Sequence, residues 1–209
     1  MPNIMNRSIF PKQQQGAIMI ITLIALSLLM LSALALIRSF DTSLSMAGNL
    51  AFKRDLVNQG ERGMAKAIAL FNAGALSTAA ARNSDSLANN YSAIMLKSNA
   101  HGIPTALLSN PTISGKTMFD VDISMTAADV SDTSSGITVR YVIDRLCTAA
   151  GEAFSNDKCI GFKQVSSQGG SVPLAPKKTG QEFQPVYRIS VRATGPRNTQ
   201  LFLQTTITR

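Results

Sequence analysis

Two cysteines are the residues of this sequence best suited to covalent chemistry. Cys147 and Cys159 are the chain's only cysteines, and a disulfide between them would close a loop of 13 residues, counting both ends. The chain-entropy argument gives such a bridge about 3 kcal/mol of stabilisation. A single pair that follows a long apolar segment is typical of an oxidising compartment, so we predict this disulfide. The alternative is a pair of buried, unpaired thiols.

Other residues that could do chemistry are isolated from the partners they need. His101 is the only histidine, so a zinc site or a Ser-His-Asp triad has no support. No phosphate-binding loop of the Walker type occurs. Asp120, Asp122, Asp129 and Asp132 are loosely grouped, and a predicted strand carries the first two on one face. The sequence predicts no enzyme, no catalytic residue, no cofactor and no metal, with calcium at the acidic group as the alternative.

The most informative segment is an apolar run near the N-terminus. Ala17–Ile37 contains 21 residues without a charge, which as a helix would span about 31 Å. That length matches the hydrocarbon core of a membrane, about 30 Å thick. The polar residues 1–16 precede it and end in Gly16, whereas an ordinary secretory signal has its cleavage site after the apolar stretch. A cut after Gly16 would therefore remove a leader and keep the membrane helix.

These features resemble the PilX family of type IV pilus assembly proteins, which are minor pilins. The matching segments are Gln15–Ile20, Met46–Asn49, the polar helical stretch Gln59–Ala69 and the terminal strands between Tyr187 and Thr205. Residues 75–135 match no family pattern. The resemblance implies that prepilin peptidase cuts after Gly16 and methylates Ala17. It implies a single-pass inner-membrane protein with a periplasmic domain, built into an extracellular pilus with the major pilin and other minor pilins, and with a tip adhesin as a further partner.

One position departs from the pattern of major pilins. These proteins carry Glu as the fifth mature residue, where this chain has Ile21, and they begin with Phe, where this chain would begin with Ala17. In a filament the Glu of an incoming subunit pairs with the amino terminus of the subunit ahead. A charge buried in an apolar bundle is costly unless it is paired. A subunit without the Glu would be tolerated best at the tip of the filament, where no subunit lies ahead of it. The alternative is that Ile21 reflects ordinary membrane anchoring outside any filament.

The pattern of apolar residues predicts an α+β fold with one long helix. The helix should run from 17 to 72, with a membrane segment at 17–37 and an amphipathic continuation at 38–72 that packs on a sheet. Residues 73–209 form the predicted periplasmic domain. Alternation predicts an antiparallel sheet of about four strands, at about 117–126, 137–143, 186–194 and 201–207. Glycines at 48, 60 and 63 should weaken the helix locally.

Net charge separates the remaining function classes. The chain carries +8, which would fall to +6 without the leader, and its bases are scattered, including Arg188, Arg192 and Arg197. We therefore expect a solvated surface rather than a nucleic-acid interface. The predicted function is a non-catalytic minor pilin that primes pilus assembly at the tip and supports twitching motility and adhesion. The alternatives are a pseudopilin of a type II secretion system and a membrane-anchored binding or adhesion module outside any filament.

Overall fold

A computed structural model of the chain describes residues 15–110, 112–132, 136–152, 158–164 and 182–209. The chain divides into two compact units, residues 1–52 and 53–209, and helix α1 (Gln15–Asn72) contributes to both. The predicted leader, residues 1–16, lies outside the described residues except for its last two. The predicted helix is confirmed, with its first turn two residues earlier than expected.

The first unit consists of the N-terminal part of α1. This segment contains no proline and is rich in Leu, Ala, Ile and Met, which favour the helical conformation. Every residue from 16 to 51 is exposed. The chain therefore does not bury the apolar part of its own helix, and a membrane or other subunits would have to cover it.

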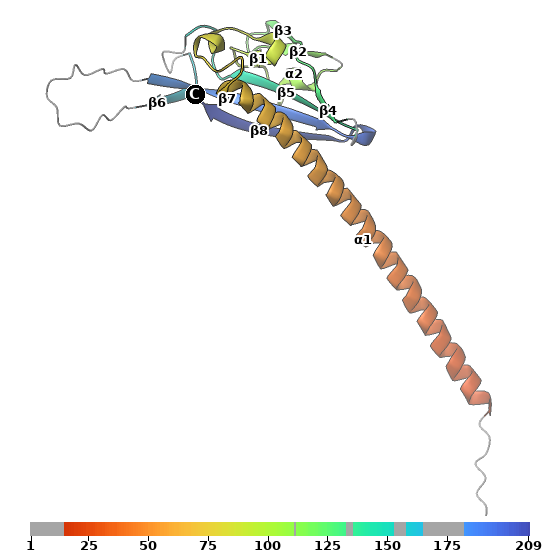
Figure 1. Cartoon of the computed structure of the whole chain (residues 1–209). Helices are drawn as coiled ribbons and strands as arrows, with labels where there is room; N and C mark the ends of the chain where they lie inside the picture. Colours follow the sequence, from red (N-terminus) through yellow and green to blue (C-terminus); the bar gives the residue numbers. More distant parts are fainter. Residues whose placement is uncertain (1–14, 111, 133–135, 153–157, 165–181) are drawn as a thin grey trace, which may run out of the picture. The chain divides into compact units, whose positions relative to one another are not determined.

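The second unit contains a six-stranded sheet built around two long strands, β5 (Ile137–Arg145) and β7 (Glu182–Thr194) (Figure 1). These two strands pair antiparallel, with Val139 opposite Ala193 and Arg145 opposite Tyr187. On its other edge β7 pairs antiparallel with β8 (Gln200–Thr208). A 3-10 helix, Pro196–Asn198, lies in the short connection between β7 and β8, so the strands predicted at 186–194 and 201–207 form a terminal hairpin.

Three shorter strands complete this sheet, and none of them was predicted as such. The strands are β1 (Tyr91–Ser92), β4 (Val130–Asp132) and β6 (Gly161–Gln164). The predicted α+β fold, one long helix packed on a sheet, is confirmed, although β1 pairs with β5 in parallel and makes the sheet mixed rather than wholly antiparallel. β4 pairs with β5, and β6 pairs with the first residues of β7, beyond the end of β8. Strands of two to four residues are too short for an alternation pattern to be recognised.

The strand predicted at 117–126 is wrong in its extent and its place. Two shorter strands, β2 (Ile113–Lys116) and β3 (Asp122–Met125), pair antiparallel in a separate two-stranded sheet. A turn joins them, because Asp120 takes a positive φ of 58° and its amide donates to the carbonyl of Thr117. The apolar residues at 118 and 121 therefore belong to a turn rather than to a strand.

The last five turns of α1 cover one face of the large sheet. The buried line along this helix is Leu56, Gly60, Gly63, Ala67 and Phe71. A Cβ added to Gly63 would lie 2.4 Å from Val139 Cγ1, and one added to Gly60 would lie 2.7 Å from Leu203 Cδ1. The two glycines are thus points of close contact between helix and sheet, which the expectation of local weakness missed.

The amphipathic continuation predicted at 38–72 implies an apolar stripe along one helical face, and this stripe is only partly right. Of its members within the second unit, Phe71 is buried, whereas Val57, Met64 and Ile68 are half-buried at the border of the contact. Its earlier members, Phe40, Leu44, Ala47 and Leu50, are exposed. Packing on the sheet therefore begins near Leu56 rather than at the start of the predicted amphipathic segment.

The opposite face of the sheet carries an outer layer formed by residues 93–125. Helix α2 (Thr105–Leu108) and the β2–β3 sheet lie in this layer. The hydrophobic cluster under it consists of Leu96, Ala106, Leu107, Ile113, Ile123, Met125 and Val142. Two further 3-10 helices, Ala80–Asn83 and Leu87–Asn89, precede it. The segment between α1 and β5, which matched no family pattern, thus contributes a hydrophobic cluster to the domain's core.

Candidate functional site

The first candidate surface is the apolar helix that precedes the domain. α1 is long and apolar enough to cross a membrane, with a mean hydropathy of 2.8 in its most apolar window. The first charged residue along it is Arg38. The predicted processing residues Gly16 and Ala17 lie in the first turns and are exposed, as is Ile21, which is 64% exposed. All three positions are therefore accessible on the surface of the helix.

Hydroxyl groups within the apolar run are already satisfied by the helix itself. Thr22 donates to the carbonyl of Met19 at 3.0 Å, and Ser27 donates to that of Ile24 at 2.8 Å. Ser32 makes the same kind of bond to Leu28 at 2.8 Å. An unsatisfied polar group costs free energy in hydrocarbon. These bonds therefore lower the free-energy cost of placing the three hydroxyl groups in an apolar environment.

The second candidate surface surrounds the disulfide. The structure pairs Cys147 with Cys159, as predicted. Next to the bridge, Ile160 donates its amide to Leu146 and accepts from Val186, so the chain returns directly to the sheet. Ile160 and Phe162 are nevertheless 59% and 67% exposed. The chain between Gln164 and Gln184 is rich in Gly and Pro, which is typical of a surface excursion, and it lies largely outside the described residues.

An exposed apolar turn is connected to the same region by backbone hydrogen bonds. Met118, Phe119 and Val121 in the β2–β3 turn are 49–60% exposed. The Met118 amide donates to the carbonyl of Met95, and the Met95 amide donates to that of Cys147. The turn, residue 95 and the disulfide segment therefore lie side by side. This surface was not predicted, because the alternation of residues 117–126 indicated a strand where the chain turns.

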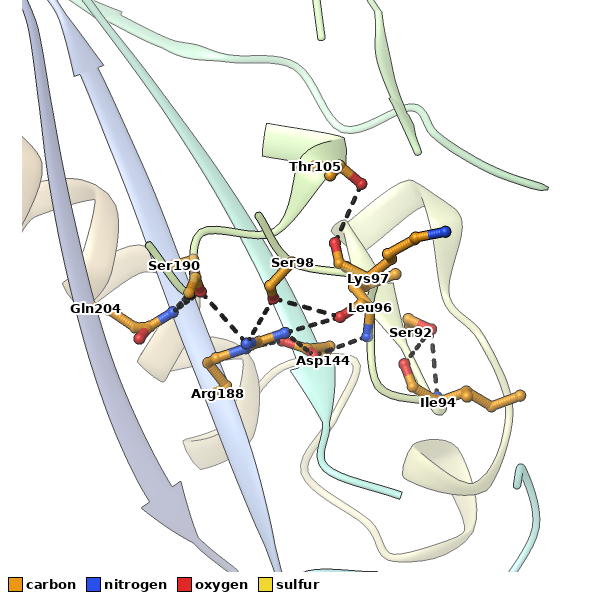
Figure 2. A network of polar contacts seen from close by, with 11 residues as sticks. Ser92, Ile94, Leu96, Lys97, Ser98, Thr105, Asp144, Arg188, Ser190 and Gln204 are labelled. Carbon is orange, nitrogen blue, oxygen red and sulfur yellow. Dashed lines mark hydrogen bonds and ion pairs between the residues drawn. The ribbon is translucent and has the colours of Figure 1, made fainter. Parts of the chain in front are cut away.

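A buried ion pair holds the outer layer on the sheet (Figure 2). Arg188 of β7 donates through Nε and Nη2 to Asp144 of β5, at 2.9 and 2.6 Å. The same carboxylate accepts the Leu96 amide at 3.0 Å, while Arg188 also donates to the Leu96 carbonyl and to Ser98 Oγ. Burial raises the pKa of the Asp144 carboxyl, and the bonds from Arg188 and Leu96 oppose this rise. The pair thus fixes the segment that leads into α2.

A second polar cluster fixes the chain that follows α1. Arg82 donates to the Tyr187 hydroxyl at 3.0 Å, and the Tyr91 hydroxyl donates to the carbonyl of Arg82 at 2.6 Å. Arg145 donates to the carbonyl of Ala93. The ring of Phe71 at the end of α1 meets that of Tyr187 edge to face, with centroids 5.0 Å apart. Burial is the main cause that raises the pKa of both tyrosines.

Several bases expected on the surface are therefore part of the core. Arg188, expected as a scattered solvated charge, has a side chain that is only 12% exposed, and Arg192 is 6% exposed. The sheet accommodates Arg188 because its guanidinium meets the carboxylate of Asp144 and the carbonyl of Leu96. The sequence offered only the alternation of β7 as a signal, since Arg188, Ser190 and Arg192 share one face of that strand.

The predicted acidic group is not gathered into one loop. Asp120 lies 2.6 Å from Lys97, Asp122 lies 3.9 Å from Lys116, and Asp129 forms a two-bond pair with Arg140. Lys97 lowers the pKa of Asp120. His101 is exposed in a turn. Within the described ranges, no three His, Cys, Asp or Glu side chains converge as metal ligands would.

Comparison with known proteins adds no identification to this description. The chain matches no family model, no curated protein and no solved structure. Its resemblance to the PilX family therefore stays a prediction from the residues that carry it.

Proposed function

We propose that this protein is a minor pilin of a type IV pilus, anchored by α1 in the inner membrane before assembly. The domain that follows α1 would lie in the periplasm. In this proposal the subunit has no catalytic role. It joins the tip region of the filament and helps to prime assembly with other minor pilins and the major pilin.

The observation that carries this proposal is the exposed apolar helix that continues without a break into a folded domain. Residues 16–51 are exposed throughout, and the last five turns of the same helix pack on the sheet. Such a helix can be covered by lipid and then by the apolar helices of neighbouring subunits, because both surroundings are apolar. A simple tether would not need the helix to be part of the domain's own core.

Two further features support a place among other subunits. Ile21 stands where a carboxylate would be needed to neutralise the amino terminus of a subunit ahead, which supports a tip position. The exposed turn Met118–Val121 and the residues after the disulfide give the domain an apolar surface of its own. We propose that another minor pilin contacts this surface.

The first test is mass spectrometry of the mature N-terminus, in cells with and without prepilin peptidase. The proposal expects a methylated terminus at Ala17 that depends on the peptidase. Gly16→Val should block processing, whereas Gly48→Val should not, although both glycines have no neighbouring atom within 4 Å of an added Cβ. An intact leader in both strains would contradict the proposal and leave a membrane-anchored periplasmic module.

A second test separates a pilus from a type II secretion system. Deletion of the protein should reduce the number of surface pili and twitching motility while leaving secretion of exoproteins unchanged. The reverse result would identify a pseudopilin, for which the same helix physics applies.

A further inference from the structure

Strand β8 forms an edge of the large sheet (Figure 1). It pairs with β7 along its whole length, and among the described residues no strand pairs with its other side. The nine residue pairs keep one register, from Val186 opposite Thr208 to Thr194 opposite Gln200, so no bulge interrupts the strand. Such an edge exposes a row of backbone N–H and C=O groups that can pair with another chain.

The hydrogen bond that closes the hairpin shows which backbone groups of β8 point outwards. The Gly195 amide donates to the Thr199 carbonyl at 2.9 Å, in the same register that places Ala193 opposite Leu201. Hydrogen-bonded pairs alternate along an antiparallel ladder. The odd-numbered residues of β8 therefore direct their backbone groups at β7, and the even-numbered residues direct theirs away from it. The outward-directed residues are Gln200, Phe202, Gln204, Thr206 and Thr208.

The chain does not protect this edge in the ways that edge strands usually do. Charged side chains, proline and bulges discourage an edge strand from pairing with another chain. β8 contains no charged residue and no proline, and its three threonines, Phe202 and Ile207 favour the strand conformation. The edge is therefore suited to receive a further strand.

A cavity opens beside the same edge. It has a volume of about 230 Å³, and its lining includes Phe202–Gln204 of β8 together with His101, Ile103 and Leu107 of the outer layer. His101 and Gln204 are exposed, so the cavity is open to solvent. Most of the lining side chains are apolar. The cavity thus adjoins the outward-directed backbone groups of β8 and offers them an apolar neighbour.

Gln204 holds the walls of this cavity in place. Its Nε2 donates to the Gly102 carbonyl at 3.2 Å and to Ser190 Oγ at 3.0 Å, and Figure 2 shows the second of these bonds. Gly102 belongs to the outer layer and Ser190 to β7, so one side chain connects the layer, the central strand and the edge strand. The cavity is therefore formed before anything binds to it, as is usual for a binding site.

We propose that the outer edge of β8 and this cavity together bind an extended segment of another protein, which adds to the sheet as a further strand. Main-chain hydrogen bonds to the even-numbered residues of β8 give affinity. A large apolar side chain of the segment, placed opposite Phe202 or Gln204, enters the cavity and gives specificity. An apolar cavity of roughly 150 Å³ already holds a benzene-sized molecule, so this cavity has room for one such side chain.

Charge indicates that the segment is acidic and does not come from a second copy of this chain. Residues 195–209 contain two bases, Arg197 and Arg209, and no acid, in a chain of net charge +8. Antiparallel pairing of two β8 edges would bring Arg209 of each copy towards Arg197 of the other, and like charges repel. An acidic residue near either end of the segment would meet one of these bases instead. The site uses only residues of the folded domain, so it stands whether or not the protein is a pilin.

The first test uses the full chain, purified in a nonionic detergent and immobilised, with a phage-displayed library of random nonapeptides as the probe. We expect enriched peptides to share β-branched residues, one large apolar residue near the centre and an acidic residue near an end. Enrichment of peptides that resemble β8 itself would identify a second copy as the occupant and overturn the proposal. Failure to enrich any extended apolar sequence would overturn it as well.

Thr206→Pro tests the outward-directed backbone groups. Proline removes the N–H of this residue, and an edge strand tolerates proline where that N–H faces away from its neighbour. Binding of an enriched peptide, measured by fluorescence anisotropy, should weaken about tenfold, while Tm stays close to that of the wild type. Thr205→Pro, which removes an N–H directed at β7, should lower Tm instead. Equal peptide binding by wild type and Thr206→Pro would show that the peptide does not pair with β8.

His101→Trp tests the cavity and keeps the experiment informative if Thr206→Pro folds poorly. His101 is an exposed residue of the lining, so a larger ring there should occupy the cavity without entering the core. Peptides with the large apolar residue should bind this variant several-fold more weakly than wild type. The same peptides with alanine at that position should bind both proteins equally. If His101→Trp binds the original peptides as wild type does, the cavity takes no side chain and the proposal is wrong.

Discussion

Gly63 of α1 lies so close to Val139 of β5 that a single added carbon would be 2.4 Å from Val139 Cγ1. Helix and sheet therefore meet at the distance that a residue without a side chain permits. Three small residues, Gly60, Gly63 and Ala67, form the centre of the buried line between two larger ones, Leu56 and Phe71. The packing of α1 on the sheet thus depends on the absence of side chains at Gly60 and Gly63 as much as on the apolar side chains of Leu56 and Phe71.

Gly63→Ala should destabilise the domain, although alanine is the better helix former. Overpacking at such a contact costs about 1–3 kcal/mol, which outweighs a helix-propensity gain of about 1 kcal/mol. Gly48→Ala, at a helical glycine with no atom within 4 Å of the new Cβ, should be neutral or slightly stabilising. Denaturant unfolding of the full chain in detergent measures both, and a Gly63→Ala variant as stable as Gly48→Ala would refute the close contact.

Asp144→Asn should strongly destabilise the attachment of the outer layer. The substitution leaves Arg188 nearly buried without a counter-charge, and breaking a buried pair in this way costs about 3–5 kcal/mol. Asp120→Asn is the matched control, because its pair with Lys97 is exposed on both sides, and little change is expected. Hydrogen exchange of residues 94–108 should increase in Asp144→Asn only. Equal behaviour of the two variants would show that the buried pair does not hold this layer.

The chain's three tyrosines should resist ionisation while the protein is folded. Burial raises the pKa of Tyr91, Tyr141 and Tyr187 above the ordinary value of 10.0. In the unfolded chain they ionise near that value, so their contribution to stability is present below pH 10 and is lost as the pH rises further. Phenolate absorbance should appear together with alkaline unfolding. Ionisation of any tyrosine near pH 10 in the still-folded protein would contradict its burial.

Loss of the disulfide should weaken the domain by about 3 kcal/mol, the value expected for a loop of this length. Reduction of the wild type and the double replacement Cys147→Ala/Cys159→Ala should lower the free energy of unfolding by similar amounts. Reductant should leave the double variant unchanged, which serves as the internal control. A wild type that is insensitive to reductant would show that the bridge contributes nothing to stability.

Ile21→Glu should redistribute the subunit if the proposed assembly role is right. The new carboxylate would neutralise the amino terminus of a subunit ahead, so incorporation along the shaft would no longer be penalised. Immunogold labelling of pili should move from the tip towards the shaft, and Ile21→Leu should leave it at the tip. Labelling along the whole shaft in the wild type would contradict the tip position directly.

The long elements of the fold were predictable because their patterns extend over many residues. The unbroken apolar run and the absence of proline indicated α1, and the alternation in residues 137–143 and 186–194 indicated β5 and β7. The disulfide followed from the presence of a single cysteine pair. In each case the signal is local or nearly so, and tertiary packing agrees with it.

The rest depends on contacts between residues far apart in the sequence. Nothing near Tyr91 shows that it pairs in parallel with Ile143. Arg188 was taken for a surface charge because its partner, Asp144, lies 44 residues away. The role of Gly63 as a contact point requires Val139 to be in place. Of the candidate surfaces, the helix was predictable, whereas the Met118–Val121 turn was not, because a positive φ at Asp120 converts a strand pattern into a turn.

The position of β7 in the chain governs when the domain can fold. This strand pairs with β5, β6 and β8, and its residues Val191 and Ala193 lie under α1. They leave the ribosome only after about nine-tenths of the chain, so α1 is complete long before the sheet that receives it exists. Until the final hairpin arrives, the emerging chain therefore carries an uncovered core, which is prone to aggregate unless a chaperone shields it.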